Sequence, residues 1–93
     1  MINMEDILDM TDLTHEEIAA IAEHEHVPDV NAAALAAYLS GEPKGFQEIQ
    51  QMICEDIRDA LHRDDVPHAR ELYAVLHHFM ETHPGAARGS APG

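Results

Sequence analysis

The stretch "KGFQEIQQMICEDIRDALHR", residues 44–63, decides the fold of this chain. Apolar side chains recur in it at steps of three and four residues, which is the period of one face of an α-helix. A helix with a single apolar stripe buries that stripe against neighbouring elements. We therefore predict a helix over 44–63 that packs inside a helical domain. The stripe consists of Phe46, Ile49, Ile53, Ile57 and Leu61.

The segment that follows predicts a second helix, over residues 67–82, packed against the first. The residues "DDVP" at 64–67 interrupt the pattern, and Pro67 suits the first turn of a new helix. Because the link between the two helices is short, we expect an antiparallel hairpin. The stripe expected to face inward is Ala69, Leu72, Tyr73, Leu76, Phe79, Met80 and His83.

Two further helices are predicted upstream of this hairpin. Thr14 and Glu17 have the spacing of a capping box, which marks the start of a helix over 14–26. That helix must end before Pro28, because the residue preceding a proline is pushed away from helical dihedral angles. The helix over 28–40 contains "VNAAALAAYLS", which is apolar nearly all round and is therefore expected to be central and buried.

Together these patterns predict an all-α protein, a compact bundle of four helices in a single domain over residues 1–83. A short additional helix is expected within residues 1–10. Residues 84–93, rich in Pro, Gly, Ala and Ser, are expected to form a flexible, disordered tail. The sequence has no alternating strand pattern and no internal repeat. The four predicted helices span residues 14–26, 28–40, 44–63 and 67–82.

The charge of the chain narrows the classes of partner. Eighteen Asp and Glu against five Lys and Arg give a net charge of −13, and residues 1–43 hold ten acids and no Lys or Arg. Such a surface repels nucleic-acid phosphates and anionic membranes, so we expect neither as a partner. Residues 13–39 have the helix-break-helix outline of a DNA-binding motif, but its second helix lacks the basic side chains that the motif requires.

Length and cysteine content indicate the location and the assembly. A chain of 93 residues has a thin core, which dimerisation would complete, so a homodimer is predicted. The single cysteine, Cys54, is compatible with a reducing compartment. The sequence contains no apolar run of membrane-spanning length and no signal-peptide pattern. We expect a cytoplasmic protein.

No recognisable catalytic arrangement is present in the sequence. It has no Gly-x-Ser-x-Gly, no Gly-rich phosphate loop and no His-Glu-x-x-His, and Cys54 is predicted to be an inert thiol at the edge of the stripe. We therefore predict no catalytic residue and no cofactor. The favoured function is that of a small acidic accessory protein that binds a protein partner with a basic surface.

The alternative function is metal binding. Glu23 and His26 have the Glu-x-x-His spacing that ferritin-like di-metal bundles use for ligands. His77 and Glu81 form a second pair at i, i+4, and the two pairs would converge if their helices packed together. A homodimer would duplicate the set, and its nitrogen and oxygen atoms suit Fe, Mn or Zn. Ordinary solvated side chains at helix ends are the competing interpretation.

The eight histidines invite a third hypothesis, sensing of pH. Protonation of all eight would bring the net charge from −13 to −5 near the ordinary histidine pKa. Individually, His26 and His83 are predicted to cap helix ends, where a protonated ring meets the negative end of the helix dipole. The other predictions concern solvent: His24, Glu48, Glu55, His62 and His78 are expected to face water, whereas His68 is expected to flank the core.

Overall fold

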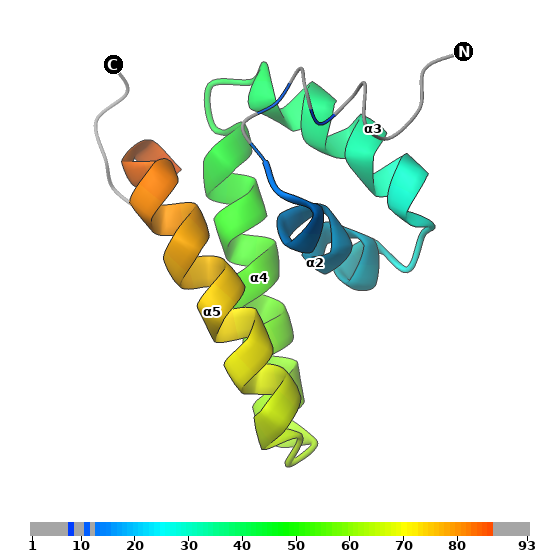
Figure 1. Ribbon diagram of the computed structural model, residues 1–93, viewed down its shortest axis with the longest axis vertical. Coiled ribbons are helices and arrows are strands. Elements are labelled where there is room, and N and C mark those ends of the chain that lie inside the picture. The colour runs from blue at the N-terminus through cyan, green and yellow to red at the C-terminus, as the bar shows by residue number, and fades with distance from the viewer. Residues whose placement is uncertain (1–7, 9–10, 12, 87–93) are drawn as a thin grey trace.

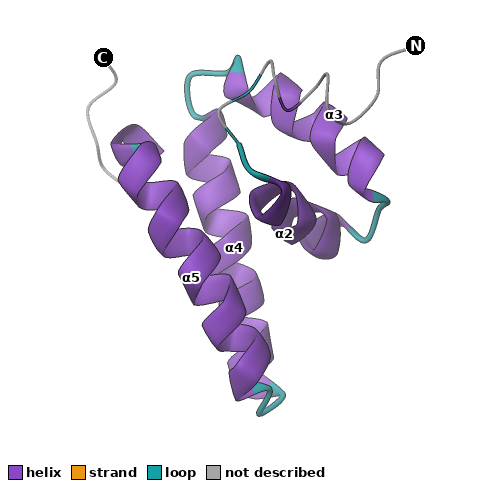
Figure 2. Ribbon diagram, viewed as in Figure 1, coloured by secondary structure: helices purple, strands orange, loops and turns teal. Residues whose placement is uncertain are grey.

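The computed structural model describes Leu8, Thr11 and residues 13–86. Within these residues the chain is all-α, as predicted, and forms no strand (Figures 1 and 2). The predicted short helix within 1–10 lies, except for Leu8, outside the described residues, as do residues 87–93. The elements are α2 (His15–Glu25), α3 (Asp29–Ser40), α4 (Gly45–His62), α5 (Val66–Thr82) and the short 3-10 turn η1 (Pro84–Ala86).

The four helices form an antiparallel hairpin with a second pair laid against one part of it. Helices α4 and α5 run side by side along the longest dimension, which is 39 Å (Figure 1). Helix α2 packs on both members of the hairpin, and α3 packs on α2 and α4. The end of the hairpin that carries the α4–α5 turn extends past α2 and α3 (Figure 1). One end of the hairpin is therefore covered by helices and the other is not.

The helix starts follow the local signals in the sequence. The Thr14 hydroxyl accepts a hydrogen bond from the Glu17 backbone N–H at 3.2 Å, and the Glu17 carboxylate accepts one from the Thr14 N–H at 2.9 Å. This is the predicted capping box. At the start of α5, the Asp65 carboxylate accepts a hydrogen bond from the His68 N–H. Helix α2 ends at His26, which adopts the left-handed conformation with φ of 58°.

The core lies where α2, α4 and α5 meet. Its largest fully buried apolar side chains are Phe79 and four isoleucines, and alanines fill the contacts of α2 with α3. Small alanines let the helices approach closely while they retain high helix propensity. The backbones of α3 and α4 come close together at Gly45, where an added Cβ atom would lie 1.6 Å from the Leu39 carbonyl oxygen. The four isoleucines are Ile18, Ile21, Ile49 and Ile53.

Helix α3 does not occupy the central position that its composition predicts. It lies at the edge of the molecule (Figure 1), where the side chains of Val30 and Tyr38 are 48% and 65% exposed. Ala32, Ala33 and Ala36 form its buried face. The prediction was wrong because most of the apolar character of this helix comes from alanine. Exposure of a methyl group costs little, so an alanine-rich helix is stable with one face in water.

The two predicted hairpin stripes are buried along only part of their length. Ile49, Ile53 and Phe79 are fully buried, but Leu61 is 52% exposed and Tyr73 is 62% exposed, contrary to the predicted inward position. Leu61 follows the fully buried Ala60, and Tyr73 follows the buried Leu72, so each exposed side chain points about 100° away from a buried one on its helix. Helix α2 has 11 residues and α4 has 18, so α2 spans about 16 Å and α4 about 27 Å, which also leaves the far end of α4 uncovered.

The ordered chain continues past the predicted boundary at residue 84. Pro84–Ala86 form the turn η1, and the side chain of Ala86 is fully buried in the core. His83 ends α5, as predicted, and its ring stacks on Phe79 and lies tilted against Phe46, at centroid distances of 4.8 and 4.5 Å. This aromatic stack fixes the direction of the chain after α5 and turns Ala86 back towards the core.

Candidate functional site

A groove runs along the seam between α2 and α5. One hollow of about 310 Å³ is lined by Thr14 at the start of α2 and His78 near the end of α5. The adjoining hollow of about 440 Å³ is lined by Glu23 at the end of α2 and His68 at the start of α5. The two helices are therefore antiparallel along the seam. We call the two hollows together the α2–α5 groove.

The floor of the groove is apolar and its rim is acidic. The rim carries three carboxylates, of which Glu16 and Glu71 are exposed and Glu23 is partly exposed, and the buried Glu17 is a fourth that lines the groove. No Lys or Arg of the described residues lines either hollow. A protein with this arrangement attracts a cationic side chain to the rim and an apolar one to the floor. The floor consists of Ala19, Ala20, Leu72, Ala74 and Val75.

A carboxyl group also lies below the end of the groove that Thr14 lines. Glu17 is 1% exposed, because one of its carboxyl oxygens is held by the Thr14 backbone N–H in the capping box. Its second oxygen, Oε2, is buried and has no hydrogen-bond partner in the described part of the chain. Buried polar atoms are usually hydrogen-bonded, so this oxygen can accept from a donor that reaches it. The sequence predicted the cap but not the oxygen without a partner.

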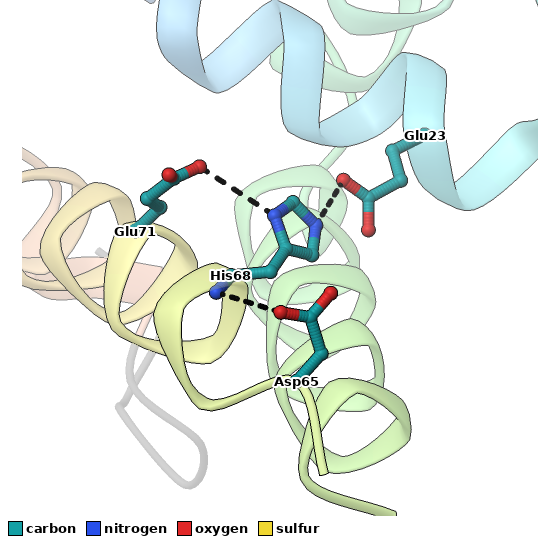
Figure 3. Close-up of polar contacts among 4 residues, drawn as sticks. All are labelled: Glu23, Asp65, His68 and Glu71. Carbon is teal, nitrogen blue, oxygen red and sulfur yellow. Dashed lines mark hydrogen bonds and ion pairs between the residues drawn. The ribbon is translucent and has the colours of Figure 1, made fainter. Parts of the chain in front are cut away.

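At the other end of the groove, His68 contacts three carboxylates, two through its ring and one through its backbone N–H (Figure 3). Its Nε2 atom lies 2.7 Å from Oε1 of Glu23, and its Nδ1 atom lies 3.5 Å from Oε2 of Glu71. The hydrogen bond with Glu23 is the main reason why the pKa of His68 is raised. The backbone N–H of the same residue donates to Asp65. A protonated His68 therefore neutralises part of the acidic rim.

A second histidine–carboxylate pair joins α2 to α4. The Nε2 atom of His24 lies 2.9 Å from Oε1 of Glu55, and this hydrogen bond lowers the pKa of Glu55. The prediction that both side chains face water was wrong for His24, which is only 26% exposed. Adjacent residues of α2, Glu23 and His24, thus reach different helices of the hairpin. Together the two contacts link the end of α2 to both α4 and α5.

Asp56 lies beside this second pair and is 7% exposed. Its Oδ2 atom has no hydrogen-bond partner among the residues that the structure describes. Burial raises the pKa of this carboxyl, and the His24 ring opposes that effect. Asp56 follows Ile49 by seven residues and Ile53 by three, so helical spacing places it on the buried face of α4. The predicted stripe left it out because it followed apolar residues only.

The four residues of the metal hypothesis lie as two separate groups in one chain. Glu23 contacts His68, whereas His77 contacts Glu81 at 2.7 Å on the exposed side of α5. His77 follows His68 by nine residues, or about 13 Å along the helix axis. His26 is exposed at the end of α2. Within Leu8, Thr11 and 13–86, no three His, Cys, Asp or Glu side chains are placed to hold a metal ion. A site shared by two copies stays a prediction.

Cys54 has the position predicted for it at the edge of the α4 stripe. It is partly buried, its sulfur accepts a hydrogen bond from Gln50 at 3.0 Å, and burial raises its pKa. A thiol with a raised pKa is a poor nucleophile, because the thiolate is the reactive form. The side chain contributes packing to this face of α4.

Comparison with known proteins adds no assignment to this geometry. The chain matches no protein family, no curated protein and no solved structure. None of the helices in the described residues has the length and apolar character needed to cross a membrane. The function must therefore be argued from the arrangement of the side chains, and the α2–α5 groove is the arrangement best suited to recognition.

Proposed function

We propose that this chain is a small binding protein that holds a basic, amphipathic segment of a partner protein in the α2–α5 groove. The observation that carries the proposal is the apolar floor with three carboxylates on its rim and no Lys or Arg lining it. An amphipathic helix docks by laying its apolar side chains in a groove of this kind. Lysine or arginine side chains flanking that apolar face would then meet the rim.

The distribution of charge supports a basic occupant over an acidic or a neutral one. The whole chain carries −13, and the part up to residue 43, which includes α2, carries ten acids without a Lys or Arg. Charge of one sign on this scale accelerates encounter with a partner of opposite sign and disfavours others. The proposal keeps two further predictions from the sequence, the homodimer and the cytoplasmic location.

The experiment measures binding of a labelled peptide by fluorescence anisotropy. The probe is an amphipathic helix of leucine and lysine, and its counterpart has glutamate in place of every lysine. We expect saturable binding of the lysine peptide alone, and an affinity that falls as the salt concentration rises. Absence of saturable binding, or equal binding of both peptides, would contradict the proposal.

Two double variants with the same net charge locate the site. Glu16→Gln with Glu71→Gln removes two carboxylates of the rim, whereas Glu42→Gln with Glu48→Gln removes two exposed carboxylates elsewhere. We expect the rim variant to bind the lysine peptide roughly fivefold more weakly, since two partly exposed ion pairs contribute ~1 kcal/mol together. The control variant should bind nearly as the unmodified chain does. An equal loss in both variants would show general charge attraction without a groove.

A further inference from the structure

The free end of the α4–α5 hairpin carries an apolar patch that no other described helix covers. A hollow of about 220 Å³ lies there between the two helices. The exposed fractions of the large apolar side chains around it are 52% for Leu61, 44% for Val66 and 62% for Tyr73. We call this surface the hairpin-end patch. The hollow is lined by Ile57, Leu61, Val66, Ala69, Arg70 and Tyr73.

The patch continues the two stripes that form the core. Ile49 and Ile53 are fully buried, and Ile57 and Leu61 follow them at steps of four residues along the border of the buried face, which continues through Ala60. The stripe therefore keeps its apolar character past the point where α2 stops covering it. Clustered large apolar side chains in such a position mark an interaction surface, whereas isolated ones do not. Another helical surface would complete the packing that begins in the core.

The charge of the hairpin end indicates which helical surface would cover the patch. Residues 57–73 hold three of the five Lys and Arg of the chain but only four of its eighteen acids, so this segment is close to neutral. Nearly all of the −13 lies elsewhere, and two copies of this protein repel one another over the remaining surface. Two copies that meet at the hairpin end therefore repel one another only weakly. A basic partner, by contrast, is drawn to the acidic groove.

The rim of the patch also suits a second copy. Arg70 lines the hollow, and Asp64 and Asp65 directly precede Val66, another residue of its lining. An interface with two-fold symmetry places each surface patch against the same patch of the other copy. A rim with both signs of charge is complementary to itself under this symmetry. Arg70 of each copy would then face the turn of the other.

We propose that two copies of this chain associate through their hairpin-end patches, so that the four helices of two hairpins pack together. The proposal does not depend on the peptide groove, which lies on the seam between α2 and α5. It also makes an opposite prediction about salt. Salt screens the repulsion between the two acidic chains, so self-association strengthens as salt rises, whereas binding of the lysine peptide weakens.

The test is sedimentation velocity over a range of protein concentrations. The variant Leu61→Lys with Tyr73→Lys places two charges in the patch. The matched control, Val30→Lys with Tyr38→Lys, makes the same change at two comparably exposed side chains of α3. We expect the unmodified chain and the control to form dimers, and the patch variant to have a dissociation constant raised at least tenfold. A monomeric unmodified chain, or equal effects of the two variants, would overturn the proposal.

Backbone amide chemical shifts of the unmodified chain give a second readout that needs no variant. On dilution, we expect the shifts that change to be confined to residues 57–73. Changes confined to α2 or α3 would overturn the proposal, even if a dimer forms. Helical circular dichroism of the patch variant should equal that of the unmodified chain, because both substituted side chains are more than half exposed. Failure of that variant to fold leaves the dilution experiment as the deciding measurement.

Discussion

The ring of His68 in the first turns of α5 lies 2.7 Å from the carboxylate of Glu23 in the last turn of α2, Nε2 to Oε1. The pair closes one end of the α2–α5 groove and links residues that are 45 positions apart in the sequence. The net charge of the acidic rim therefore depends on whether the His68 ring is protonated. The same contact therefore bears on stability, on pH dependence and on the charge that a partner meets.

We predict that the stabilising effect of this pair is lost as the pH rises. The hydrogen bond with Glu23 raises the pKa of His68 in the folded chain. The contribution is therefore complete below the unfolded histidine pKa of about 6.5, and it disappears as the pH rises through the folded value. For a partly exposed pair we expect about 0.5 kcal/mol. Thermal unfolding of a double-mutant cycle with Glu23→Gln and His68→Gln measures the coupling at each pH.

The test is decided by whether the coupling energy of this pair rises or falls with pH. The coupling energy between positions 23 and 68 should be larger near pH 6, which lies below the unfolded histidine pKa, than near pH 9. Each glutamine keeps a polar side chain at its position, so the cycle isolates the charge-assisted part of the contact. A coupling that grows with pH would show that another group controls the contact.

We predict that replacement of Asp56 by asparagine stabilises the protein at neutral pH. Burial raises the pKa of this carboxyl, so its contribution to stability falls as the pH rises from the unfolded value near 3.9. At pH 7 the charged form is buried at 7% exposure with Oδ2 unpaired in the described structure. Asp56→Asn should raise the free energy of unfolding by roughly 1 kcal/mol.

Measurement of urea unfolding at two pH values tests this. The gain from Asp56→Asn should shrink towards pH 4.5, where the native carboxyl is increasingly protonated in the fold. The control is Asp59→Asn, one turn further along α4 and exposed, with an expected change within about 0.5 kcal/mol. Destabilisation by Asp56→Asn at pH 7 would mean that the attraction to His24 outweighs the cost of burial.

The helices could be predicted from the sequence because their signals are local. The period of the stripe in α4 and the Thr14–Glu17 spacing depend only on residues within a few turns. The pairs of the candidate site are different in kind. His24 and Glu55 are 31 residues apart, and their contact depends on which helices cross and where they cross. No pattern within one helix contains that information.

The uncovered end of the α4–α5 hairpin could be predicted in part from the sequence. The predicted helices over 14–26 and 44–63 already differ in length by about 10 Å, so the first cannot cover the second. Leu61 lies on the uncovered length of α4, whereas Tyr73 is exposed because it points away from the side of α5 that carries the buried Leu72. The apolar composition of α3 suggested too much burial, because an alanine-rich helix is stable with one face in water.

Thr14→Ala should destabilise the fold by about 1 kcal/mol or somewhat more. The substitution removes the hydroxyl that accepts the Glu17 N–H at 3.2 Å, at the start of the helix that lines the groove. Loss of this cap also loosens the buried Glu17 carboxylate, which accepts the Thr14 N–H. Chemical denaturation is the measurement. Thr14→Ser keeps the hydroxyl and should retain most of the stability, so equal losses in both variants would argue against the cap.

Gly45→Ala should be among the most damaging single substitutions in the chain. A Cβ atom at this position would lie 1.6 Å from the carbonyl oxygen of Leu39 and 2.4 Å from its carbonyl carbon. Because both are backbone atoms, the clash is relieved only if the end of α3 moves away from the start of α4. We expect a loss of roughly 3 kcal/mol in the free energy of unfolding, at the upper end of the range for overpacked sites. Gly41→Ala is the matched control, since its added Cβ meets only an ordinary contact at 3.6 Å and its φ of −91° suits alanine. Thermal unfolding followed by circular dichroism compares the two. Equal melting temperatures for Gly45→Ala and the unmodified chain would mean that α3 and α4 are not in close backbone contact, which is the contact that places α3 at the edge of the molecule.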